Sequence, residues 1–165
     1  MKKSSLLTLL LWLFCFLTSC FHISEKASNT DDFYSRKSGW DPARIPFLKP
    51  YEAVKVGAPR SWFLNLDGAD GDTGFQNIKK AVVVDSVIFI YSTNSILHGI
   101  DIKETWHIIV PVKHIEKGFS DHRDYVNYLN KLGIQKEPHL YDIEAIADYF
   151  ENHDTIDWNA ISTVN

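Results

Sequence analysis

The middle of the chain alternates short apolar runs with turn residues, a pattern typical of β-strands. Residues 61–66 (Ser-Trp-Phe-Leu-Asn-Leu) form one strand candidate, and residues 105–113 form another. Pro111 has no backbone N–H to donate to a neighbouring strand. The second strand is therefore expected to lie at a sheet edge or to end near this proline.

The strongest apolar run spans residues 81–91 and is rich in β-branched side chains, which favours strand over helix. Asp85 and Ser86 interrupt it. One long strand would place these two polar residues on opposite faces of a buried ribbon. Turn residues between two apolar runs favour a hairpin instead, in which residues 78–84 pair with residues 87–92.

Two amphipathic helices are predicted in the last third of the chain. The first begins after the N-cap Asp121 and ends at Gly133, with Ile134 making the apolar contact that follows such an end. The second begins at Asp142, and Asn152 can close it. Apolar residues recur along both at three- and four-residue spacing: Tyr125, Tyr128, Leu129 and Leu132 in the first, and Ile143, Ile146, Ala147 and Phe150 in the second.

These elements predict an α+β fold, in which a small antiparallel β-sheet is followed by two C-terminal helices packed on one of its faces. With 165 residues, the chain has room for one ordinary domain. Its 45% hydrophobic and 23% charged residues are normal for a globular protein. A net charge of -4 argues against a general nucleic-acid binder.

The first twenty residues have the pattern of a secretory signal. A basic start at Lys2 and Lys3 precedes residues 6–17, which carry no charge. Twelve helical residues span about 18 Å, whereas the hydrocarbon core of a bilayer is about 30 Å thick. An uncleaved anchor remains an alternative, because Phe21 and Ile23 extend the apolar run, and so does an ordinary cleaved signal.

The end of this segment, Leu17-Thr18-Ser19-Cys20, resembles the lipobox of bacterial lipoproteins. The other cysteine, Cys15, follows two bulky residues and does not fit the motif. The resemblance implies that residues 1–19 are a signal peptide and that Cys20 carries diacylglycerol, through which the protein's partner is the membrane of the bacterial cell envelope. In many Gram-negative lipoproteins an aspartate directly after the acylated cysteine favours retention in the inner membrane. Here that position is Phe21, which favours the outer membrane if the organism is Gram-negative.

The mature chain is expected to comprise a flexible tether, residues 20–44, and a single α+β domain, residues 45–165. Polar and small residues without a period dominate the tether up to Asp41. Both cysteines precede the domain, so the domain can hold no disulfide and no zinc–thiolate site.

An acidic, glycine-rich loop at residues 67–74 is the one candidate metal site. Asp67, Asp70 and Asp72 could offer carboxylate oxygens to Ca²⁺. Counting Asp70 as position one of an EF-hand, position twelve is Ala81 instead of the closing glutamate. Asp and Gly are also the ordinary residues of turns, so the loop is interpreted as a strand connection and no metal or other cofactor is predicted.

The sequence contains no signature of catalysis. Gly-x-Ser-x-Gly, Ser-x-x-Lys, His-Glu-x-x-His and the phosphate-binding glycine motifs are all absent. We therefore predict no catalytic residue and expect the protein not to be an enzyme.

Residues 105–134 loosely resemble small uncharacterised bacterial lipoproteins, in which a strand ending in a basic turn leads to a helix closing on Leu-Gly-Ile. This resemblance implies an α+β lipoprotein and adds nothing about activity. The expected function is a lipid-anchored binding module for an envelope protein, with an exposed apolar or aromatic patch or an uncovered strand edge. Two alternatives are an immunity-type lipoprotein that neutralises a toxin through an acidic face, and a cryptic hydrolase with a strongly perturbed carboxylate or histidine in a cleft.

Overall fold

The computed structural model describes residues 31–39, 43–69 and 71–161. They belong to one compact unit, Asp31–Asn165, which begins upstream of residue 45, where the domain was expected to start. The predicted signal peptide, Cys20 and the part of the predicted tether before Asp31 lie outside the described residues. None of the helices in the described part of the chain combines the length and the hydropathy that a membrane span requires.

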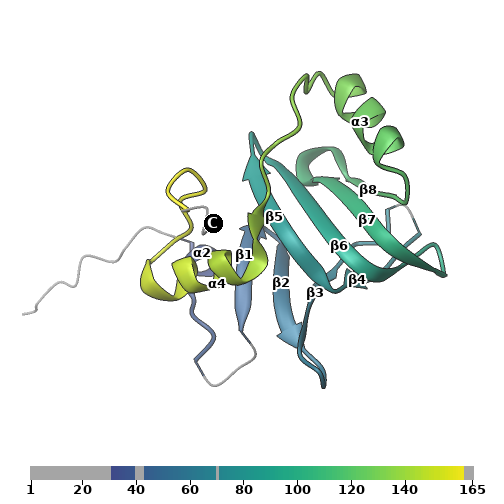
Figure 1. Cartoon of the computed structure of the whole chain (residues 1–165). Helices are drawn as coiled ribbons and strands as arrows, with labels where there is room; N and C mark the ends of the chain where they lie inside the picture. Colours follow the sequence, from purple (N-terminus) through teal and green to yellow (C-terminus); the bar gives the residue numbers. More distant parts are fainter. Residues whose placement is uncertain (1–30, 40–42, 70, 162–165) are drawn as a thin grey trace, which may run out of the picture. The chain divides into compact units, whose positions relative to one another are not determined.

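Two antiparallel sheets make up most of this unit (Figure 1). The first has the order β1-β2-β3-β4, with the strands Arg44–Leu48, Tyr51–Val56, Ser61–Asn65 and Gly74–Gln76. The second has the order β8-β7-β6-β5-β9, with the strands Ile115–Phe119, Ile100–Val110, Val87–Leu97, Ile78–Val84 and Tyr141–Asp142. The chain crosses from the first sheet to the second at Asn77, between β4 and β5.

The predicted hairpin is confirmed as β5 and β6. Val84 pairs with Val87 across a two-residue turn. Asp85 and Ser86 both have left-handed backbone angles, with φ of 49° and 64°. A two-residue turn of type I′ needs positive φ at both positions, and its twist matches that of the flanking strands.

The other two strand predictions are also confirmed. Residues 61–66 contain β3, which ends at Asn65. The strand predicted to end near Pro111 is β7, which ends at Val110 and is followed by the 3₁₀ helix η1, Pro111–Lys113. β7 pairs with β6 on one side and with β8 on the other. It is therefore an interior strand, and the proline follows its end.

The two predicted helices form with the expected caps. α3, His122–Lys131, begins at Asp121, whose carboxylate accepts the Arg123 N–H. At its other end the Ile134 N–H donates to the Leu129 carbonyl, and Gly133 has a φ of 84°. This is a Schellman ending.

α4, Ile143–Asn152, begins at Asp142, whose carboxylate accepts the N–H groups of Glu144 and Ala145. Both helix starts agree with the sequence analysis because a capping aspartate acts on its own neighbours and needs no tertiary information.

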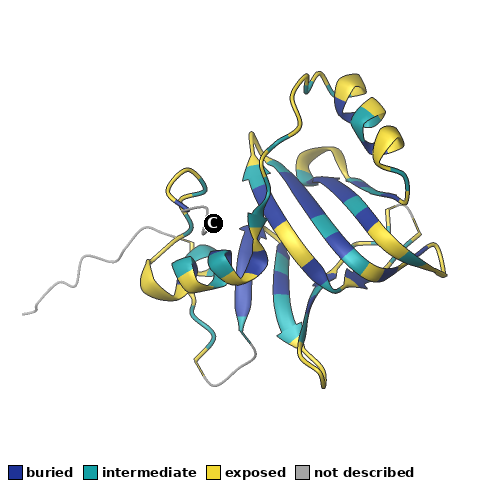
Figure 2. Ribbon diagram, in the orientation of Figure 1, coloured by how far each residue is buried: buried dark blue, intermediate teal, exposed yellow. Residues whose placement is uncertain are grey.

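The expected arrangement of one sheet with both helices on one face is wrong, although the α+β class is right. Buried residues succeed one another along β6 at Ile88, Phe89 and Ile90, so the second sheet is covered on both faces (Figure 2). Ile88 and Ile90 belong to a core shared with the first sheet and α4, whereas Phe89 belongs to a core shared with α3. We call these the inner and the outer face of the second sheet.

Strands β1 and β2 of the first sheet lie in residues 44–56, for which the sequence analysis predicted no strand. β1 contains Pro46, which fits because β1 is the edge strand of its sheet. Upstream, a short helix α2, Asp32–Ser35, is tied to β1 by Arg44, whose guanidinium donates to the carbonyls of Phe33 and Arg36. The described part of the predicted tether therefore packs on the domain.

A buried histidine lies on the inner face. His107 is 3% exposed, and its ring stacks on Phe75 with 3.7 Å between the centroids. Its Nε2 lies 3.1 Å from the hydroxyl of Thr105, which lies 2.6 Å from that of Ser92. Burial lowers the pKa of His107 to about 3, so the ring is neutral in the folded protein at neutral pH.

This histidine makes stability depend on pH. In the unfolded chain His107 takes up a proton near pH 6.5, whereas the folded protein takes it up only near pH 3. The stabilisation is complete above pH 6.5 and is lost as the pH falls towards 3, by up to about 1.4 kcal/mol per pH unit. Urea unfolding at several pH values should show a shallower acid slope for His107→Gln than for the wild type. The exposed His139→Gln should keep the wild-type slope, and an unchanged slope in His107→Gln would contradict this assignment.

Candidate functional site

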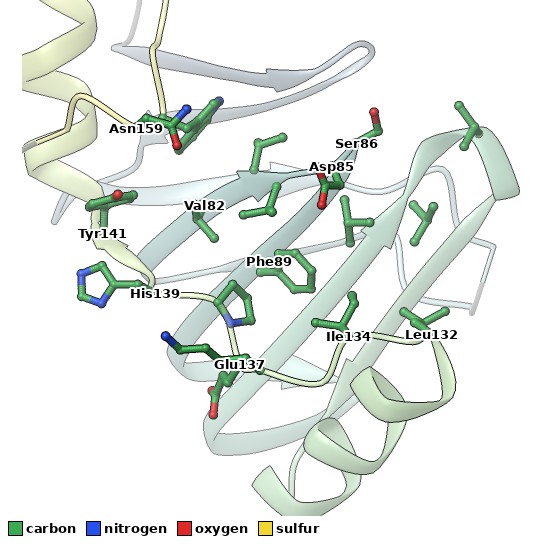
Figure 3. A pocket seen from close by; sticks show the side chains of 18 of the residues that line it. Val82, Asp85, Ser86, Phe89, Leu132, Ile134, Glu137, His139, Tyr141 and Asn159 are labelled. Atoms are coloured by element: carbon green, nitrogen blue, oxygen red, sulfur yellow. The ribbon is translucent and has the colours of Figure 1, made fainter.

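An apolar pocket of about 980 Å³ lies on the outer face of the second sheet (Figure 3). Strands β5 and β6 and the end of β7 form its floor, with Val82, Phe89 and Val110. Leu132 and Ile134, where α3 ends, form one wall. The Schellman ending places Ile134 in this wall, because it turns the chain sharply after Gly133.

Residues 136–140 cross the outer face as a strap that closes another side of the pocket (Figure 3). Glu137 ties the strap to the start of α3, with its carboxylate oxygens 3.1 and 3.2 Å from His122 Nε2. Pro138 and His139 continue this wall. The strap then joins the sheet as β9 at Tyr141.

The C-terminal segment supplies the remaining wall through Trp158 and Asn159. The Trp158 ring stacks on Phe47 with 5.9 Å between the centroids, which fixes it to the first sheet.

Exposed apolar side chains gather at the mouth of this pocket. Val84 is 41% exposed and Val112 is 79% exposed, and both line it. The described residues include only three other large hydrophobic side chains that are exposed: Val56, Ile96 and Ile100. Apolar surface around a concave site is typical of binding surfaces.

Charged groups stand at the rim. Lys113 and Lys136 line the pocket, and neither makes an ion pair within the described ranges. Asp85, in the turn between β5 and β6, places a carboxyl group at the end of the pocket where Ser86 lies. The site therefore combines an apolar floor with two available cations.

One edge of β5 is open beside this pocket. β9 pairs with Lys80 and Ala81 only, and in the described chain no strand pairs with residues 82–84 on that side. In a two-residue hairpin the pair flanking the turn exchanges backbone hydrogen bonds, and bonded pairs alternate along the ladder. Val84 and Val82 therefore bond to β6, and the N–H and C=O of Val83 point to the open edge.

The acidic loop does not gather its carboxylates in the described residues. Asp67 lies 3.2 Å from the Tyr51 hydroxyl, whereas Asp72 accepts the His98 N–H at 2.9 Å. Asp70 lies outside the described residues. Within the described ranges no three His, Cys, Asp or Glu side chains come together as metal ligands would.

The loop is held by a carboxylate that the sequence analysis missed. Glu116 is 3% exposed and accepts the N–H groups of Asp67 and Ala69 at 2.6 and 2.8 Å, and the Tyr51 hydroxyl at 2.9 Å. Burial and the neighbouring Glu116 raise the pKa of the Tyr51 hydroxyl. The only signal in the sequence was a glutamate two residues before Gly118.

The hydrolase alternative gains no support from this geometry. Ser86 and His139 both line the pocket, but they lie at opposite ends of it in Figure 3. His107, whose pKa is strongly lowered, is stacked on the inner face and lines neither this pocket nor the two smaller ones lined by residues 59–79 and 142–144 and by residues 80–106 and 137–140.

The pocket residues come from predicted strands, from the end of the first predicted helix and the residues after it, and from the C-terminal segment around Trp158. Val84 and Val112 were the available signals, because each extends an apolar run into a turn. Their convergence depends on how the second sheet pairs and on where the strap crosses it, neither of which is local.

No family model, no curated protein and no solved structure matches the chain.

Glu116 should be essential to the acidic loop. In Glu116→Gln an amide NH₂ would face backbone N–H donors, and a charge-assisted acceptor would be lost. We expect the free energy of unfolding to fall by about 2 kcal/mol in urea titrations, and the loop to become more sensitive to protease. Glu104→Gln is the matched control, because Glu104 accepts the Tyr91 hydroxyl at an exposed position and should cost less than about 0.5 kcal/mol. Equal costs would contradict this role of Glu116.

Proposed function

We propose that the protein is a lipid-anchored binding module of the bacterial cell envelope, whose pocket on the outer face takes up an apolar group of its partner. The observation that supports this proposal is that exposed valine side chains lie at the mouth of an open apolar pocket. A floor of Val82, Phe89 and Val110 would remove an apolar group from water, and each 100 Å² buried contributes about 2.5 kcal/mol. Lysines at the rim would orient the bound group.

The anchor is the second part of the proposal. Acylated Cys20 would hold the chain at a membrane, because a two-chain anchor resists release. In a Gram-negative cell the favoured membrane is the outer one. The eleven residues from Cys20 to Thr30 reach at most about 40 Å when fully extended. The pocket would therefore meet partners close to the membrane surface.

The pocket should bind a neutral apolar probe. N-phenyl-1-naphthylamine fluoresces when it enters an apolar site, and we expect it to bind the wild-type chain. Val112→Asp places a charge at the mouth and should weaken binding about five-fold or more, because the probe would have to desolvate the carboxylate. Since Val112 is 79% exposed, the fold should tolerate this change.

Ile100→Asp is the matched control for the probe. Ile100 is also exposed, at 63%, but does not line the pocket, so its variant should bind the probe like the wild type. Absence of probe binding, or equal losses in both variants, would refute the pocket as a binding site.

The anchor has its own test. Cells grown with an alkyne-bearing fatty acid should label the wild-type protein and Cys15→Ala, whereas Cys20→Ala should lose the label, because the proposed thiol is gone. Cys15 is the matched control, since it is the only other cysteine of the chain. Equal labelling of Cys20→Ala would show that the anchor assignment is wrong.

A further inference from the structure

The open edge of β5 is the feature that the proposed function does not use. We infer that the group bound in the pocket belongs to a short extended peptide segment of the partner, which adds as a strand to β5 at Val83. An apolar side chain of that segment would occupy the pocket, and a carboxylate would meet the rim lysines. This inference rests on the proposed function, because it names the chemistry of the ligand for the same pocket.

The backbone of Val83 is the first support. Its N–H and C=O point away from β6, and no strand of the described chain pairs with them. Tyr141 already pairs with Ala81 on the same edge, so an added strand would extend an existing ladder towards the turn. Strand addition of this kind draws affinity from backbone hydrogen bonds and specificity from pockets for alternate side chains.

The alternation of side chains is the second support. Val82 faces the outer face and lines the floor of the pocket, whereas the Val83 side chain packs towards the inner core. A strand added beside them would place every second side chain on the outer face. That side chain would lie over Val82 and reach the floor at Phe89.

The polar edge favours a peptide over a lipid chain. An acyl chain lying beside residues 82–84 would strip water from the N–H and C=O of Val83 without replacing its hydrogen bonds. An unpaired backbone group costs about 1–3 kcal/mol. A peptide backbone supplies both a donor and an acceptor at the required spacing.

The charges at the rim and the length of the open edge further restrict which peptide can bind. Lys113 and Lys136 make no ion pair within the described ranges, so an acidic side chain or a C-terminal carboxylate beside the apolar residue would complement them. The open edge runs for three residues, or about 10 Å, between the Ala81–Tyr141 pair and the turn. The docked strand is therefore three to four residues long.

A library of eight-residue peptides displayed on phage and selected on the full chain provides the probe. The selected sequences should combine an apolar residue with a neighbouring acidic one. A synthetic, labelled copy of the best sequence is then titrated against variants by fluorescence polarisation. Failure to select any binder would overturn the inference.

Val83→Pro is the decisive variant, and Val83→Ala is its matched control. Proline removes the N–H that faces the open edge but no hydrogen bond to β6, and proline is tolerated at such edge positions. Alanine removes the same side-chain packing and keeps the N–H. We expect the peptide to bind Val83→Pro at least ten-fold more weakly than Val83→Ala, and equal binding by the two would overturn strand addition.

If Val83→Pro does not fold, as judged by its thermal melt, strand addition is tested with modified peptides instead. Methylation of the peptide's backbone nitrogens one at a time should weaken binding about ten-fold at one position only, the nitrogen whose N–H donates to the Val83 carbonyl. A uniform or absent effect would overturn the inference.

The apolar probe separates this inference from the proposed function. Folded Val83→Pro should bind N-phenyl-1-naphthylamine like Val83→Ala, because both variants lose the Val83 side chain and keep the floor of Val82, Phe89 and Val110. Probe binding without any peptide binding, together with tight binding of laurate, would show that the pocket holds an acyl chain and that the inference fails while the proposed function stands. Loss of both kinds of binding in the wild type would refute the two together.

Discussion

The hairpin of β5 and β6 is apolar on both faces, and the rest of the structure is arranged to cover it. Ile88 and Ile90 need a cover on the inner face, which the first sheet and α4 provide. Phe89 needs one on the outer face, which α3 and the strap provide. Because consecutive residues of a strand point to opposite sides, neither cover can replace the other. The two layers on either side of the second sheet follow from this single strand.

The outer cover is incomplete, and the pocket is the part that remains open. α3 packs on β7 and β8, at one end of the sheet order, whereas the pocket lies over β5 and β6 (Figure 1). The Schellman ending at Gly133 turns the chain away before it reaches Val82. Only the strap crosses the remaining face, and a single extended segment is too narrow to fill it. An exposed apolar surface of this kind costs solubility, which is why we attribute a binding role to it.

Features specified by near neighbours could be predicted from the sequence, and features specified by distant pairing could not. Asp121, Asp142 and the Asp85–Ser86 turn act within four residues, so the helix starts and the hairpin were predicted correctly. The first sheet was missed because β1 carries Pro46 and neither β1 nor β2 has a long apolar run. Glu116 was missed because its partners at Asp67 and Ala69 are 49 and 47 residues away. The pocket has the same origin, since its lining comes from four separate segments.

The open edge at Val83 follows from the path of the strap. The chain leaves α3 on the outer face and must reach the far edge of the sheet before α4 can begin at Asp142. It joins that edge only at Tyr141, so an antiparallel continuation opposite residues 82–84 would require strap residues that are already crossing the face. An unpaired apolar edge normally invites aggregation, and proteins limit it by length and by charge. Here the Ala81–Tyr141 pair and the Asp85 turn limit the open edge to three residues, which is too short for a stable pairing between two copies but long enough for the proposed peptide, whose side chain would also enter the pocket. In the proposed binding mode the pocket and the edge complement each other: the edge would select an extended backbone, and the pocket would supply the apolar burial that three residues of ladder lack.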